Sequence, residues 1–100
     1  VRTVPHLHGA RTRPESDGLP EKWFTPGESA LYSYPNEQQA ATLWYHDHAL
    51  GITRLNVYAG LSGFYLLCDR SEIGMNLPSG AYEIPLVVQD RTLDDQGQLV

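Results

Sequence analysis

Short apolar stretches separated by turn residues recur along the chain, and they predict β-strands rather than long helices. Residues 2–8 include the β-branched Thr3 and Val4 and are followed by Gly9, which predicts a strand. Residues 41–46 follow a polar turn at residues 36–39 and form a second predicted strand. Residues 61–68 carry the strongest strand pattern, an aromatic and aliphatic run without charge. Because this run has no polar face, we expect it to be buried on both sides of a sheet.

Weaker patterns predict further strands. Residues 30–34 place alternate apolar side chains on one face, and residues 83–89 form another apolar run in which Pro85 puts the start at an edge or bulge. The turn at residues 94–97 then begins a hairpin. Five or six short strands joined by turns are typical of an antiparallel β-sandwich or barrel, so the predicted fold class is all-β.

The segments between these strands are irregular. Residues 9–27 form a long loop rich in glycine and proline, in which the Asp-Gly pair at residues 17–18 is a turn by its chemistry. Residues 49–55 fit one or two irregular helical turns. Residues 69–78 form a connector with a helical turn near Ser71.

Length and composition narrow the class of protein. One hundred residues are enough for one domain, and 7 basic against 12 acidic residues give a net charge of −5. The basic residues are scattered, which argues against a nucleic-acid partner. The apolar runs are too short for a membrane span or a signal peptide. A single cysteine cannot form an internal disulfide, so cysteine usage does not indicate the compartment.

The two ends suggest a piece of a longer protein. The chain opens in strand-like sequence at Val1 without an initiator methionine, and it stops shortly after the turn at residues 94–97. A hairpin cut after its turn favours a fragment over a complete domain.

All four histidines occur in two His-x-His pairs, His6-Leu7-His8 and His46-Asp47-His48. In an extended strand, residues i and i+2 project from the same face, so each pair presents two imidazoles side by side. Two such pairs brought together would form a four-imidazole metal site, and imidazole suits zinc, copper, iron and nickel. A structural zinc site would usually recruit cysteine, so zinc is the weaker candidate.

We interpret the other notable residues as structural rather than as metal ligands. Asp47 lies between the two histidines of the second pair. In a strand its side chain would point to the opposite face, which predicts a structural hydrogen-bond partner. We interpret Trp44 and Tyr45 as packing around the site rather than as redox relays. Cys68 has no neighbouring histidine, and we interpret it as a buried strand thiol rather than a ligand. Cupins and zinc hydrolases also use His-x-His pairs, but a cupin follows its pair with a nearby glutamate, and Glu15 comes too late.

Longer motifs resemble a known family. His-Leu-His-Gly is followed by a Ser-Asp-Gly-x-Pro loop, and Trp-Tyr-His-Asp-His-Ala precedes Thr-Arg-Leu-Asn-Val-Tyr-Ala-Gly-Leu. Together with Pro-Leu-Val-Val-Gln-Asp-Arg-Thr near the end, these motifs are similar to the first cupredoxin domain of a multicopper oxidase. The resemblance is to the bacterial branch with spore-coat laccases and bilirubin oxidases. It implies that residues 1–100 are part of a cupredoxin-like Greek-key domain, the N-terminal of three.

The resemblance also implies site residues. His6 would bind the type 2 copper of a trinuclear cluster, His8 and His46 would share one type 3 copper, and His48 would bind the other. The remaining ligands and the type 1 copper would belong to the last domain. Asp17 would help deliver protons to oxygen, in addition to forming the turn, because the reduction of dioxygen to water consumes protons.

The expected function is therefore that of a laccase-like copper oxidoreductase, of which this chain supplies half of the cluster histidines. Its partners would be O2, phenolic or related aromatic substrates, and the remaining cupredoxin domains, or further copies of the chain through exposed edges. The resemblance implies a location outside the cytoplasm or on a spore surface. The alternative is a stand-alone copper-binding module without turnover, since no type 1 site lies in this chain.

Overall fold

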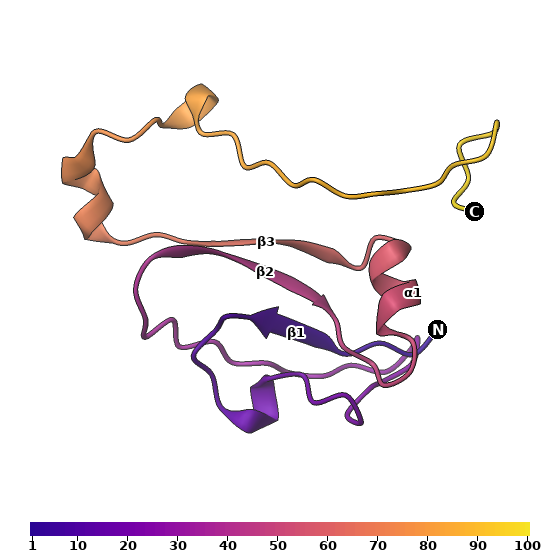
Figure 1. Ribbon diagram of the computed structural model, residues 1–100. Helices are drawn as coiled ribbons and strands as arrows, with labels where there is room; N and C mark the ends of the chain where they lie inside the picture. Colours follow the sequence, from indigo (N-terminus) through magenta and orange to yellow (C-terminus); the bar gives the residue numbers. More distant parts are fainter.

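A three-stranded antiparallel sheet forms the centre of the computed structural model, which describes residues 1–100 (Figure 1). Its strands, in the order β1-β2-β3, are β1 (Pro5–His8), β2 (Ala41–Asp47) and β3 (Ser62–Leu67). The helical segments are η1 (Pro14–Ser16), α1 (Thr53–Tyr58), η2 (Arg70–Met75) and η3 (Gly80–Tyr82). None of these helices has the length and apolar character that a membrane crossing requires.

The register of the sheet sorts the side chains onto two faces. His6 pairs with His46 across β1 and β2, and His8 pairs with Trp44. Because side chains alternate along a strand, Leu7 and Leu43 point to the opposite face, where both are buried. The sheet therefore presents a histidine face on one side and contributes to the small apolar core on the other.

A short helix connects the second and third strands. The predicted helical turns at residues 49–55 are confirmed, but the helix begins at Thr53 and ends at Tyr58. Gly51 adopts a φ of +80°, a left-handed conformation that keeps the preceding residues in a turn. Asn56 is buried in this helix, and its side-chain amide donates a hydrogen bond to the Arg2 carbonyl at 3.0 Å. The helix is thereby fixed to the segment that leads into β1.

The loop predicted at residues 9–27 is confirmed, with η1 inside it. Its far end is attached to the start of the chain by two backbone hydrogen bonds of 2.9 Å between Thr3 and Phe24. The connector at residues 69–78 contains η2, as expected, and the turn at residues 94–97 is confirmed by a bridge between Leu93 and Leu99.

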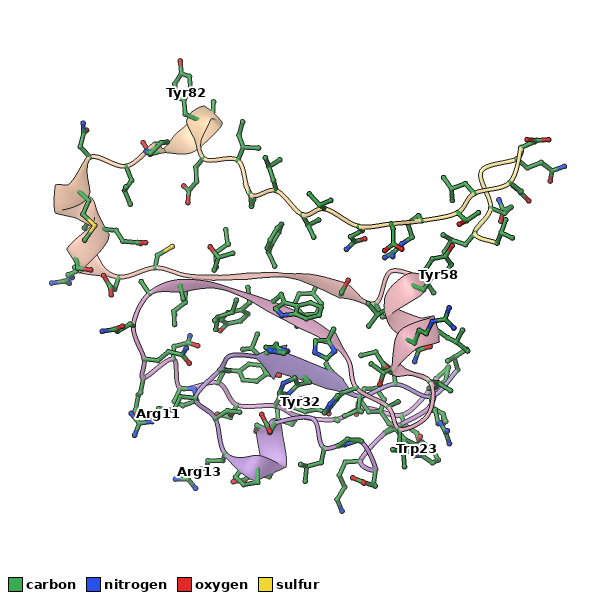
Figure 2. The ribbon with its side chains drawn as sticks, viewed as in Figure 1. Arg11, Arg13, Trp23, Tyr32, Tyr58 and Tyr82 are labelled. Atoms are coloured by element: carbon green, nitrogen blue, oxygen red, sulfur yellow. The ribbon has the colours of Figure 1, made fainter.

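Two predicted strands are not present. Residues 30–34 and 83–89 form no β-ladder, and Leu31 and Val88 are 93% and 98% exposed. An extended segment becomes a strand only when a neighbour supplies hydrogen bonds, and Pro85 has no N–H to donate. Figure 1 draws the residues after η3 as an extended coil that follows the direction of β3 without joining the sheet. In Figure 2, Tyr82 projects away from the rest of the molecule.

The prediction of burial at residues 61–68 was wrong. The strand exists as β3, but Leu61 and Leu66 are 47% and 45% exposed. Cys68 lies just beyond the end of β3 and is exposed, so the expectation of a buried thiol was also wrong. An apolar pattern indicates surfaces that can be buried, but burial requires covering elements, and β3 has only β2 as a paired neighbour.

Candidate metal centre

Three imidazoles converge on one point of the histidine face. Side-chain nitrogens of His6, His8 and His46 all lie within 4.8 Å of one another. His6 and His8 come from β1 and His46 comes from β2, so the antiparallel pairing of these two strands creates the group. The two separated motifs of the sequence thus meet in space.

The nitrogens of this group fit a metal ion. Nδ1 of His8 lies 3.3 Å from Nε2 of His46. Metal–imidazole bonds are about 2.0–2.1 Å long, so these two nitrogens are close enough to bind the same ion. A donor set made of imidazoles alone suits copper, zinc, iron or nickel.

His48 completes the four-imidazole group. Its ring stacks on that of His6, with centroids 4.9 Å apart and planes at 28°, and its centroid lies 5.7 Å from that of His46. His48 lies one residue beyond the end of β2, where its backbone N–H donates to the Val4 carbonyl at 2.8 Å. The structure therefore brings all four predicted histidines together, with His48 beside the closer group of three.

Backbone carbonyls hold three of the four rings through Nδ1. The Nδ1 atom of His6 lies 2.5 Å from the Asp17 carbonyl oxygen, and that of His48 lies 2.9 Å from the Gly18 carbonyl oxygen. In His46, Nδ1 lies 2.7 Å from the carbonyl oxygen of Asp47. A hydrogen bond to the ring nitrogen that does not bind the metal fixes the orientation of a histidine ring.

The side chain of Asp47 braces the strand end between two of the histidines. It is 2% exposed and accepts three hydrogen bonds, from the Thr3 hydroxyl (2.7 Å), the Val4 amide (3.0 Å) and the Ala49 amide (3.0 Å). Burial acts to raise the pKa of Asp47, but its hydrogen bonds outweigh that effect and the pKa lies below its ordinary value. The predicted structural role of Asp47 is confirmed.

The environment of His46 favours the neutral imidazole that a metal requires. Burial lowers its pKa, the Asp47 carbonyl acts in the opposite direction, and the neighbouring histidines lower it further, so that the pKa lies below its ordinary value. A ligand that is already deprotonated binds a metal ion without first losing a proton.

The two aromatic residues before His46 differ in their contacts. Trp44 packs on the rings of His8 and His46, with centroid distances of 5.3 and 4.3 Å. Tyr45 points to the other face, where its hydroxyl group lies over Gly63. The prediction of packing around the imidazoles is confirmed for Trp44 and wrong for Tyr45, because alternate residues of a strand face opposite ways.

Asp17 lies beside the cluster on the Nδ1 side of His6. Its carboxylate Oδ1 is 3.4 Å from that nitrogen, and its side chain is 41% exposed. Cys68 lies away from the histidines, in a hollow lined by residues of η2 and the following connector. The sequence analysis did not identify Gly18 as a site residue, because its contribution is a backbone carbonyl. The Asp-Gly pair indicated a turn at this position but not the contact with His48.

Comparison with known proteins places these features in a family. Residues 2–72 match the profile of a family described as multicopper oxidase. The chain is 53% identical to a laccase of Bacillus stratosphericus and 49% identical to a laccase of Bacillus subtilis, over 99% of its own length and 21% of each relative. It is also 45% identical to the bilirubin oxidase of Albifimbria verrucaria. The chain thus spans about a fifth of the length of the laccases that it matches.

Solved structures agree with this result. The McoA multicopper oxidase of Aquifex aeolicus superposes with a TM-score of 0.84 at 38% identity, over 99% of this chain and 23% of that one. A variant of the same protein gives a TM-score of 0.86. The predicted fold class, an incomplete cupredoxin-like β-domain, is confirmed by these neighbours and by the antiparallel sheet. The chain belongs to the multicopper oxidase family.

Proposed function

We propose that this chain supplies half of the histidine ligands of a trinuclear copper cluster in a laccase-type oxidoreductase. The full-length protein would reduce O2 to water while it oxidises phenolic or related aromatic compounds. The observation that carries the proposal is the convergence of His6 and His8 from β1 and His46 from β2 on one group of nitrogens, with the His48 ring stacked on that of His6. The laccases among its relatives support the same activity.

The geometry supports a division of the ligands among three copper ions. His8 and His46 would share one type 3 ion, because their facing nitrogens are 3.3 Å apart. His6 would bind the type 2 ion. His48 would bind the other type 3 ion, which its position beside the closer group of three supports.

The residues around the ligands have separate tasks in this proposal. Copper would supply the electron transfer to oxygen, and the chain would hold the imidazoles in place. Asp47 would keep both ends of the His46-Asp47-His48 segment fixed through its three hydrogen bonds. Trp44 would pack on the rings of His8 and His46 and help to hold their orientation.

Asp17 would pass protons towards the cluster. Dioxygen reduction consumes protons, and a carboxylate next to the site can relay them from solvent. The side chain of Asp17 is suited to this task because it is partly exposed and also lies 3.4 Å from the His6 ring. An Asp17→Asn variant should keep its copper and lose oxygen turnover.

The remaining copper ligands would come from other parts of the full-length protein. We propose that residues 1–100 form part of its first cupredoxin domain and that the type 1 copper lies in another domain. Cys68, the one cysteine in the chain, is exposed and outside the histidine group.

The test is copper content and oxygen consumption of the full-length protein, compared with a His46→Ala variant. The proposal expects the variant to lose copper from the cluster and to stop consuming oxygen with a phenolic substrate. As a matched control, Tyr45→Phe changes the neighbouring residue on the other face and should keep both properties. Full copper content in the His46→Ala variant would refute the proposal. Copper binding without oxygen consumption in the intact protein would instead favour the copper-binding module.

A further inference from the structure

The loop at residues 16–18 makes an unusually close contact with the first histidine strand. A Cβ atom built on Gly18 would lie 2.1 Å from the Pro5 carbonyl oxygen and 2.8 Å from its carbon. Gly18 also has a φ of +74°, in the left-handed region that side chains disfavour. Any other residue at position 18 would push the loop away from β1.

Two hydrogen bonds hold the loop in this position. Ser16 is buried, and its hydroxyl oxygen accepts a hydrogen bond from the Ser33 amide at 3.0 Å. The Asp17 amide donates to the Pro14 carbonyl at 3.3 Å, which closes η1. The carbonyl groups of Asp17 and Gly18 are thereby directed at the histidine face.

These two consecutive carbonyls each contact one histidine, and the two histidines belong to different His-x-His pairs. The Asp17 carbonyl lies 2.5 Å from Nδ1 of His6, and the Gly18 carbonyl lies 2.9 Å from Nδ1 of His48. A carbonyl oxygen can only accept a hydrogen bond, so each Nδ1 must carry the hydrogen. The lone pair of each neutral ring is then on Nε2, the atom left free for a metal.

We propose that the Asp17–Gly18 backbone is a tautomer clamp, which sets His6 and His48 as Nδ1–H imidazoles before any metal arrives. Gly18 is a positioning residue in this account, because only glycine allows the close approach to Pro5. The inference rests on the proposed copper site for its purpose. The tautomers themselves do not depend on copper.

The clamp is tested first without any substitution. Histidine labelled with 15N in the metal-free full-length protein reports through long-range 1H–15N couplings which ring nitrogen carries the hydrogen. We expect His6 and His48 to show Nδ1–H. His46 should show it as well, because its own partner is the Asp47 carbonyl. An Nε2–H form at His6 or His48 would overturn the proposal.

A matched pair of variants then tests the role of Gly18. Gly18→Ala should mix the tautomers of His6 and His48 and leave His46 unchanged. It should also weaken copper binding by about 10- to 100-fold, the usual effect of losing a partner of a ligand histidine. The control is Gly27→Ala, which introduces the same kind of strain at a φ of +95° but meets no atom within 4 Å. It should leave the tautomers and the copper affinity as they are.

A third variant separates the carbonyl of Asp17 from its carboxylate, whose Oδ1 also lies 3.4 Å from His6 Nδ1. Asp17→Asn keeps the backbone and should leave both tautomers unchanged, even if turnover falls. A tautomer change at His6 in this variant would assign the contact to the side chain and overturn the clamp. Correct tautomers in a protein that binds no copper would contradict the proposed function and leave the clamp intact.

Discussion

Nδ1 of His8 lies 3.3 Å from Nε2 of His46, although the two residues are 38 positions apart in the chain. The pairing of β1 with β2 produces this contact, because it sets His6 opposite His46 and His8 opposite Trp44. The candidate metal centre therefore depends on the register of one antiparallel strand pair. A shift by one residue would send the histidines of one strand to the other face.

Removal of the Asp47 carboxylate should destabilise the protein. Asp47→Ala leaves the buried amides of Val4 and Ala49 without their acceptor, at a cost of about 1–3 kcal/mol for each. We expect a loss of about 3–5 kcal/mol in the free energy of unfolding, measured by denaturant titration of the metal-free protein. Thr3→Val, which removes one hydroxyl donor and keeps the carboxylate, should cost about 1 kcal/mol. Equal losses in the two variants would contradict the assigned role.

Trp44 should contribute to copper affinity through its contacts with two ligand rings. Aromatic pairs contribute about 0.5–1.5 kcal/mol, so Trp44→Ala should weaken copper binding by up to about tenfold. Trp44→Phe keeps an aromatic ring there and should lose less. Competition with a copper chelator measures both. A Tyr45→Ala variant that loses as much affinity as Trp44→Ala would show that the effect is general destabilisation.

The isolated 100-residue chain should bind copper without developing a type 1 spectrum. Four imidazoles are available, but Cys68 is exposed and lies outside the histidine group. The intense blue absorption of type 1 copper requires a cysteine thiolate ligand, as in other blue-copper sites. Visible absorption of the copper-loaded chain tests this expectation. A strong band in the red region that disappears in a Cys68→Ser variant would refute it.

The isolated chain should also self-associate. Several large apolar side chains are almost fully exposed, among them Leu31, Leu86 and Val88. Sedimentation velocity over a range of concentrations should show species larger than a monomer. A Leu86→Lys/Val88→Lys variant should shift the distribution towards the monomer, and Arg13→Lys should leave it unchanged. A monomer at the highest concentration would contradict this prediction.

The sequence predicted which histidines share a face, because the spacing of His6-Leu7-His8 determines which side chains of a strand lie on the same side. It also predicted that the side chain of Asp47 points away from the histidine face. The meeting of the two pairs did not follow from spacing. It depends on which strands pair, and the early pair could have lain elsewhere in the sheet.

Predictions about other features were wrong for a related reason. Residues 30–34 and 83–89 have strand-like patterns, but no neighbouring strand supplies their hydrogen bonds. Cys68 has an apolar neighbourhood in sequence and is nevertheless exposed, just beyond the end of β3. The carbonyl contacts of Asp17 and Gly18 could not be predicted from the sequence. Every residue has a carbonyl group, and its direction depends on the conformation of the folded loop.

Anomalous diffraction at the copper absorption edge, from crystals of the copper-loaded full-length protein, would locate the copper ions relative to the four histidine rings. We predict copper peaks at about 2 Å from ring nitrogens of His6, His8, His46 and His48, with one ion shared by His8 and His46. Copper peaks that lie away from these four rings, or no peak beside them in a protein shown to contain copper, would contradict the account.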